Sequence, residues 1–513
     1  MVVRVSGGLV GGGREAGVAV FRGIPFAQPP VGELRFAVPR PVRGWDGVRD
    51  ATAFGPPPPQ AGVFGMDALA GQTPGDDWLT VNVWSPDPGP GAGLPVMVWI
   101  HGGAFVFGMS GLPEYDGGRL AREGGVVVVT FNYRVGFEGF GQISGAPANR
   151  GLLDQVAALE WVRDNIRAFG GDPDRVTVFG QSAGAGSVAS LLAMDRAHGL
   201  FRRAVAMSAQ GTYFAPELAA DIAAACAAEL GLPPTADALS AVAPARLSAA
   251  ADALTAKLAD FTGRWGRPAH RSIPFSPVVD GDILPRTPWQ ALADGHALDV
   301  DLLVGHTRDE HRLFGLLDGT LGQITADQAA TALRHFAPAP DGPHRYRRAF
   351  PAADPNELYE RVHADWLFRM PSLHLAEAQA AAGGRAHLSE LTWPAPGMGG
   401  ILGACHGLDV PLVFGNLDRG QPAALLGDAI PQAEAVSAQL RTAWTAFATH
   451  GDPGWPAYDP HERLTRLFDT PPSVVPYPEE ASRLLWQDHA FPVLRPVGDQ
   501  GLSAAASDVG GGL

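Results

Sequence analysis

A serine between two glycines, in Gly180-Gln181-Ser182-Ala183-Gly184, joins two segments of different pattern. Residues 176–179 are β-branched or aromatic, typical of a buried strand, and residues 183–194 are rich in Ala, Ser and Leu, typical of a helix. In the G-x-S-x-G pattern the serine occupies a strained turn from strand to helix, so that its Oγ projects above the sheet edge. We therefore predict Ser182 as a nucleophile and the Ala183 N–H as an oxyanion donor.

The same helix start also fits a dinucleotide fingerprint, because Gly184-Ala-Gly-Ser-Val-Ala189 reads G-x-G-x-x-A after a strand. That alternative implies a nicotinamide or flavin cofactor. It needs an acidic residue at the end of the next strand, and none stands at the expected distance after Met194. We favour close packing of the helix on the sheet and predict no cofactor.

A glycine pair follows another apolar run, residues 95–100, in His101-Gly-Gly-Ala-Phe105. Glycines at a strand end permit positive φ and leave the backbone amides unobstructed. An H-G-G loop supplies the other half of the oxyanion hole beside a G-x-S-x-G turn. Gly102 and Gly103 are therefore predicted donors, with an ordinary tight turn as the alternative.

A serine nucleophile needs a histidine base and a carboxylate that orients the base, in the chain order serine, acid, histidine. The segment His306-Thr-Arg-Asp-Glu-His311 follows a strand-like run at 302–305 and offers two neighbouring acids, Asp309 and Glu310. A surface charge cluster and a metal site of His306, Asp309 and His311 are the alternatives. No further ligand pattern accompanies these residues, so we predict no metal.

The elements that must position these groups alternate along the chain, with a strand-like run at 126–132 and helical spacing at 151–169. This alternation predicts a doubly wound α/β fold with a mostly parallel sheet. The formal net charge of −15 argues against nucleic acid or anionic membranes as partners. No apolar run approaches the ~18 residues of a membrane span. The two cysteines and the absence of a signal-peptide pattern lead us to expect a cytoplasmic protein.

Further blocks follow one another along most of the chain: Gly23-Ile-Pro-Phe-Ala-Gln-Pro-Pro30, Asp76-Asp-Trp-Leu-Thr-Val-Asn-Val83, Asn132-Tyr-Arg-Val-Gly136, Gly151-Leu-Leu-Asp-Gln155, Phe169-Gly-Gly-Asp-Pro173, Pro277-Val-Val-Asp-Gly-Asp-Ile-Leu-Pro285 and Gly451-Asp-Pro453. Together with the H-G-G and G-x-S-x-G segments, they resemble the type-B carboxylesterase family of the α/β-hydrolases, and its bacterial p-nitrobenzyl-esterase-like members most. The resemblance implies one α/β-hydrolase domain over residues 1–500. Helical insertions near 212–271 and 314–382 are expected over the active site, and residues 501–513 are expected to form a mobile tail.

The resemblance also assigns the remaining roles. It implies Glu310 as the acid, His406 in Gly403-Ala-Cys-His-Gly407 as the base, and Ser208 as a serine that supports the acid–base pair. Trp78 and Pro59 replace two family cysteines, which implies that the family's N-terminal disulfide is absent. Candidate pocket linings, each of which could equally be core, are Phe105, Phe107, Gln181, Tyr213, Phe214, Phe314 and Trp366.

These features predict a serine carboxylesterase that forms an acyl-enzyme on small-molecule esters. Gln181 stands where cholinesterase-like members carry glutamate, so neutral esters are the expected substrates. Carbamates or activated amides could be cleaved by the same groups. A non-catalytic binding protein, as among neuroligin-type relatives, is the other alternative, but such relatives lose members of the triad and all three are present here.

Overall fold

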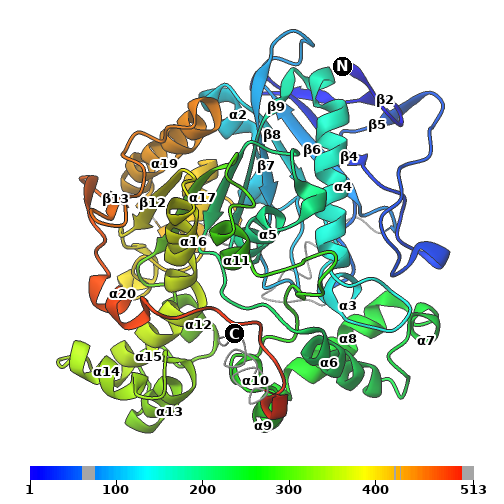
Figure 1. Ribbon diagram of the computed structural model, residues 1–513. Helices are drawn as coiled ribbons and strands as arrows, with labels where there is room; N and C mark the ends of the chain where they lie inside the picture. Colours follow the sequence, from blue (N-terminus) through cyan, green and yellow to red (C-terminus); the bar gives the residue numbers. More distant parts are fainter. Residues whose placement is uncertain (61–74, 421–422, 428, 500–513) are drawn as a thin grey trace, which may run out of the picture.

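The computed structural model describes residues 1–60, 75–420, 423–427 and 429–499 (Figure 1). The expected tail at 501–513 lies outside these residues. In the described part, an eleven-stranded sheet has the order β14-β13-β12-β11-β10-β9-β7-β8-β6-β4-β3, and a small sheet has the order β1-β2-β5. The strands from β8 through β7 and β9 to β13 pair in parallel, and antiparallel strands form both edges.

The strands have the following bounds. They are β1 Val2–Val5, β2 Gly8–Gly11, β3 Gly13–Glu15, β4 Val18–Pro25, β5 Val48–Asp50, β6 Thr80–Ser85, β7 Leu94–Ile100, β8 Val127–Phe131, β9 Gly171–Gln181, β10 Arg203–Met207, β11 Asp301–Thr307, β12 Ala386–Leu391, β13 Leu464–Phe468 and β14 Ser473–Pro476.

The central strands are apolar throughout because helices cover both faces of the sheet. Along β7, Val96, Val98 and Ile100 join one core cluster, while Met97 and Trp99 join the other. Successive side chains of a strand point to opposite faces, so a sheet covered on both sides needs a continuous apolar run.

Helices α4, α5, α11 and α16 lie on one face of the sheet, and α2, α17 and α19 lie on the other (Figure 1). Their bounds are α2 Gly118–Gly124, α4 Arg150–Asn165, α5 Ala183–Leu192, α11 Pro288–Ala293, α16 Met370–Ala381, α17 Asp409–Phe414 and α19 Ile430–His450. Further helices are α3 Gly136–Phe140, α18 Ala423–Leu426 and α20 Glu480–Trp486. This is the α/β-hydrolase arrangement that the sequence predicted.

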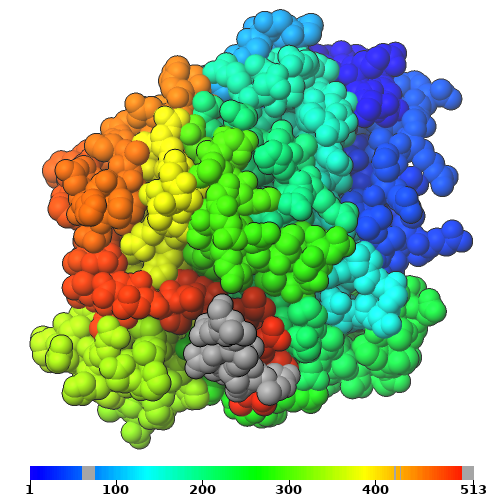
Figure 2. All heavy atoms as spheres, in the orientation of Figure 1, coloured from blue at the N-terminus to red at the C-terminus, as the bar shows by residue number. Residues whose placement is uncertain are grey.

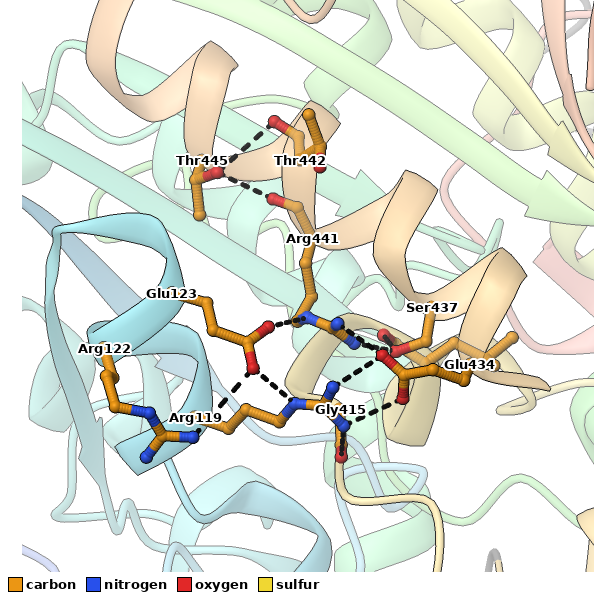
Figure 3. Close-up of polar contacts among 10 residues, drawn as sticks. Arg119, Arg122, Glu123, Gly415, Glu434, Ser437, Arg441, Thr442 and Thr445 are labelled. Atoms are coloured by element: carbon orange, nitrogen blue, oxygen red, sulfur yellow. Dashed lines mark hydrogen bonds and ion pairs between the residues drawn. The ribbon is translucent and has the colours of Figure 1, made fainter. Parts of the chain in front are cut away.

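A ring of charges joins α2 to α19 on the second face (Figure 3). Arg119 contacts Glu434 at 2.5 Å and Glu123 at 2.9 Å. Arg441 contacts the same two acids, at 2.8 and 3.0 Å respectively. Because each acid bridges two guanidinium groups, each side chain is held by two partners instead of one. The ring ties the helix before β8 to the long helix that precedes β13.

Residues 216–270 and 312–369 form two helical lobes at one end of the sheet, and the chain after residue 486 runs across from the second lobe to the first (Figure 1 and Figure 2). Leu494 on this crossing segment exchanges backbone hydrogen bonds with Tyr213 and Ala215, at 2.7 and 2.9 Å. The first lobe contains α6 Pro216–Ala228, α7 Ala236–Ser240, α8 Pro244–Thr255, α9 Thr262–Trp265 and α10 Arg267–His270. The second contains α12 Arg312–Leu317, α13 Ala326–Phe336, α14 Gly342–Ala349, α15 Pro355–Ala364 and a π-helix at Asp365–Arg369. Among the described residues, no helix is both long and apolar enough to cross a membrane.

Candidate active site

Ser182 stands at the turn between β9 and α5 with φ 59° and ψ −124°, a conformation that L-residues rarely adopt. Two glycines make the turn sterically possible. A Cβ on Gly180 would lie 2.5 Å from backbone atoms of Gly184, and a Cβ on Gly184 would overlap the carbonyl oxygen of Ile100. Gly184, the first glycine of the possible dinucleotide fingerprint, therefore has a packing role: it allows α5 to begin directly against β7.

The first amide of α5 faces the same turn. Ala183 is the first residue of the helix, and the first N–H groups of a helix have no acceptor within it. The Ser182 N–H, in contrast, donates to the carbonyl of Met207 at 2.9 Å, which fixes the turn to β10. Among the residues that the structure describes, the Ala183 N–H thus has no backbone acceptor, and it lies one residue beyond the partly exposed Ser182.

The H-G-G loop lies directly beside Ser182. A Cβ on Gly102 would be 3.3 Å from the Cβ of Ser182, and Gly103 has a φ of +115° that a larger residue would resist. Across the described ranges, the N–H groups of Gly102 and Gly103 have no backbone acceptor. The loop can therefore present two donors to an oxygen bound next to Ser182.

His101 anchors this loop. Its ring stacks on Tyr133 with centroids 4.3 Å apart, its Nδ1 lies 2.8 Å from the carbonyl of Gly102, and the Tyr133 hydroxyl donates to the carbonyl of His101 at 2.8 Å. Burial lowers the pKa of His101 to about 4, so the ring is neutral near pH 7. A neutral Nδ1–H donates to Gly102 and holds the loop against the strand end.

Glu310 lies three residues after the end of β11 and is fully buried. Its Oε2 is 2.5 Å from Nδ1 of His406, and its Oε1 accepts hydrogen bonds from Ser208 Oγ at 2.5 Å and from the Thr307 N–H at 2.8 Å. Burial by itself raises the pKa of Glu310, but the His406 charge and these three hydrogen bonds outweigh it and leave the pKa below its usual range. An ionised carboxylate thus holds the Nδ1 proton of His406.

Asp309, the rival acid, points elsewhere. Its Oδ2 accepts the Ala404 N–H at 2.8 Å and pairs with Arg308 at 3.1 Å, and its Oδ1 lies 3.7 Å from Arg312. These contacts tie the acid loop to the loop that carries His406. The partners of Asp309 therefore hold the two loops together, whereas Glu310 faces the imidazole of His406.

The candidate metal ligands are also separated. His306 Nε2 lies 3.1 Å from the Tyr477 hydroxyl, and His311 stacks on His363 with centroids 4.6 Å apart. Within the described ranges, no group of three or more His, Cys, Asp or Glu side chains is placed to hold a metal ion. His306, Asp309 and His311, the three metal ligands considered from the sequence, thus each contact different residues and do not form a common site.

The imidazole of His406 is enclosed by two aromatic rings and one amide. Phe368 lies 4.3 Å and Phe314 5.2 Å from it between ring centroids. Nε2 of Gln181 lies 3.1 Å from Nε2 of His406. Ser182 and His406 are both described, and no hydrogen bond between them is present in this structure.

Several predicted pocket linings are packed in the core. The side chains of Phe105, Tyr213, Phe214 and Trp366 are 1–2% exposed. Tyr213 donates its hydroxyl to the carbonyl of Gly186 at 3.1 Å, and Phe105 packs on Phe140 with centroids 4.8 Å apart. Of the proposed pocket residues, Gln181 and Phe314 contact His406, and Phe107 lies on the H-G-G loop with its carbonyl next to Gly103.

Sequence reasoning missed three groups at this site. The hydrogen bond from the Thr307 N–H to Glu310 could not be predicted, because the sequence does not distinguish one backbone amide at a strand end from another. Phe368 reaches His406 from the π-helix, and such bulges carry no clear local signature. Asp409 is buried three residues after His406, and burial, together with the charge of Glu310, raises its pKa to about 7. A lone acid soon after Cys405-His406-Gly407 was the available signal for Asp409.

Comparison with known proteins gives one family. A model described as the carboxylesterase family matches residues 1–473. The para-nitrobenzyl esterase of Bacillus subtilis is 39% identical over 498 residues, which cover 94% of this chain and 97% of that protein. The phenmedipham hydrolase of Pseudarthrobacter oxydans is 35% identical over 481 residues, 89% of this chain and 92% of that protein.

Solved structures agree with the sequence comparison. The crystal structure of the carboxylesterase EST55 from Geobacillus stearothermophilus superposes with a TM-score of 0.83 at 36% identity, and the match covers 95% of this chain and 100% of the other. The match extends over both helical lobes as well as the sheet, because so little of either chain is left out.

Proposed function

Because this chain belongs to the carboxylesterase family and is a carboxylic ester hydrolase, we propose that Ser182, His406 and Glu310 are its catalytic triad and that neutral esters are its preferred substrates. The observation that carries the proposal is the 2.5 Å contact between Glu310 Oε2 and His406 Nδ1, formed close to a serine held at positive φ. Fold alone would not support these roles, since one fold hosts many functions.

The proposed reaction begins with attack of Ser182 Oγ on the ester carbonyl carbon, while His406 Nε2 takes the hydroxyl proton. Nε2 carries no proton of its own, because the ionised Glu310 holds the ring's single N–H at Nδ1. His406 then gives the proton to the departing alcohol. Water repeats the sequence on the acyl-enzyme and releases the carboxylic acid.

The negative charge on the carbonyl oxygen is assigned to the N–H groups of Gly102, Gly103 and Ala183. Two of them come from a glycine loop and the third from the first position of α5, where the helix N-terminus also carries partial positive charge. Fixed amides do not reorganise when the charge forms, so their stabilisation is specific to the transition state.

Supporting groups hold the acid in place. Ser208 and the Thr307 amide both donate to Glu310 Oε1 and leave Oε2 for His406. An acid with one oxygen tied in this way cannot rotate away from the imidazole. Ser208 therefore acts on the reaction through Glu310, as a positioning residue.

The preference for neutral esters follows from the side chain beside the nucleophile. Gln181 is 6% exposed and carries no charge, so it gives no electrostatic attraction to a cationic alcohol group. A buried carboxylate at that position would favour such a group.

The test compares butyrylthiocholine with a neutral thioester of the same acyl length at low salt. We expect kcat/KM to favour the neutral ester. Preference for the choline ester by about tenfold or more, which corresponds to ~1.4 kcal/mol, would reject the assigned specificity. A parallel panel of p-nitrophenyl esters, p-nitrobenzyl esters and carbamates tests hydrolysis itself and the alternative substrates.

We also assign the enzyme to the cytoplasm, without nucleic acid as a partner. Both cysteines, Cys226 and Cys405, are free and buried, as is common in a reducing compartment. The formal net charge of −15 opposes binding to nucleic acid. Fractionation of the producing cells tests the location.

A further inference from the structure

One contact in the site has no place in the proposed reaction, namely the amide of Gln181 against the imidazole of His406. The two Nε2 atoms are 3.1 Å apart, and both side chains are nearly buried, with 6% and 5% exposed. Gln181 is the last residue of β9, immediately before Ser182, so the strand that carries the nucleophile also carries this amide.

The direction of the hydrogen bond follows from the other side of the ring. Nδ1 of His406 donates to the Glu310 carboxylate, and a neutral imidazole carries only one N–H. Nε2 is therefore a bare acceptor. Of the two ends of the Gln181 amide, only the NH₂ group can pair with it, which agrees with the Nε2 to Nε2 contact.

The same nitrogen must accept the proton of Ser182 during acylation, and it has one lone pair. Ser182 and His406 are not hydrogen-bonded in this structure, although both are described. We propose that Gln181 is a positioning residue that caps Nε2 of His406 in the resting enzyme and competes with the Ser182 hydroxyl for it. This inference rests on the proposed roles of Ser182 and His406.

Aromatic packing restricts movement of the His406 imidazole away from the Gln181 amide. Phe368 and Phe314 lie 4.3 and 5.2 Å from the imidazole, and Glu310 fixes Nδ1. Since the ring is held on these sides, the lone pair of Nε2 changes partner by movement of the Gln181 amide or of the Ser182 hydroxyl. Substrate binding beside Ser182 would displace the amide from Nε2.

A cap of this kind changes the pH dependence of the free enzyme. An N–H donor stabilises the unprotonated nitrogen, because a protonated Nε2 would oppose it with a second N–H. A variant that lacks this donor is therefore expected to show a displaced acidic limb of kcat/KM relative to the wild type. The other ionisable groups that face His406 are Glu310 and Asp409, with Cys405 and Asp309 next to them, and all four remain in the variants below.

The experiment measures kcat/KM for a neutral p-nitrophenyl ester against pH in three variants. Gln181→Met keeps the length of the side chain and removes the donor, so the acidic limb should move up by about half a pH unit or more. Gln181→Glu places a carboxylate against Nε2, favours the imidazolium and should move the limb up by about one unit or more. If Gln181→Met does not fold, Gln181→Glu alone decides.

Gln155→Met is the matched control, because Gln155 is a buried glutamine whose amide donates to Ser187 Oγ at 2.9 Å. Its acidic limb should stay at the wild-type position. Limbs that stay at the wild-type pH in the Gln181 variants, even with lower activity at every pH, would overturn the inference, since a purely structural role lowers activity without moving the limb. Labelling of Ser182 by a fluorophosphonate tests the proposed function separately, so the two failures can be told apart.

Discussion

Glu310 Oε2 and His406 Nδ1 lie 2.5 Å apart, although 96 residues separate them in sequence. The contact is possible because β11 and β12 are neighbouring parallel strands whose following loops meet at one sheet edge, where Asp309 and Cys405 also form a backbone bridge. The positions of acid and base thus depend on strand order more than on any local motif.

The two adjacent acids of this loop should respond differently to loss of charge. Glu310→Gln should lower kcat about 1,000-fold or more, because an amide does not hold the required form of the imidazole. Asp309→Asn should cost less than about tenfold, because Asp309 pairs with Arg308 and the Ala404 amide instead of His406. Steady-state kinetics on one neutral ester compare the two. A crippled Asp309→Asn with an active Glu310→Gln would contradict the geometry.

Asp409 should make stability depend on pH. Burial and the Glu310 charge raise its pKa from 3.8 to about 7. The folded state therefore binds more protons than the unfolded state between those values, and stability falls as pH rises through this window. Full ionisation costs at most roughly 4 kcal/mol.

Asp409→Asn carries no ionisable proton at this site and should remove that loss. Its midpoint of thermal unfolding should exceed that of the wild type more at pH 8 than at pH 5. A difference in midpoint that is the same at both pH values would show that Asp409 does not titrate in this range.

Gly184 should tolerate no side chain. Gly184→Ala places a Cβ on the carbonyl oxygen of Ile100, a backbone atom inside the sheet that cannot move aside. We expect loss of several kcal/mol of stability or failure to fold. In Gly186→Ala the atoms nearest to the new Cβ belong to the side chain of Gln210, which can shift more easily than backbone, so the loss in midpoint should be smaller. Equal midpoints for wild type and Gly184→Ala would exclude this close approach.

Sequence patterns predicted the parts of the site that are local. The turn at Ser182 follows from an apolar strand, two glycines and a helix, all within about fifteen residues, and the structure has the same order. The strand is longer than the apolar run at 176–179 that predicted it. Its pairing with β7 extends back to Gly171, so β9 begins there.

Contacts between distant elements could not be predicted in the same way. Tyr213 and Phe214 were weighed as pocket linings, but they are buried where the C-terminal crossing segment packs on the first lobe. The choice between Asp309 and Glu310 stayed open on residue types alone, because it depends on which carboxylate a strand end turns toward His406. Phe368 and the amide of Gln181 reach the imidazole only once the whole fold has formed.

The central claim is that Ser182 is the nucleophile of an ester hydrolase. A fluorophosphonate probe followed by intact-protein mass measurement and peptide mapping should label the wild type once, on Ser182, and should not label Ser182→Ala. The same variant should keep the wild-type unfolding midpoint within a few degrees and should lose ester hydrolysis. Labelling that persists in a folded Ser182→Ala, or that maps to another residue in the wild type, would contradict the account.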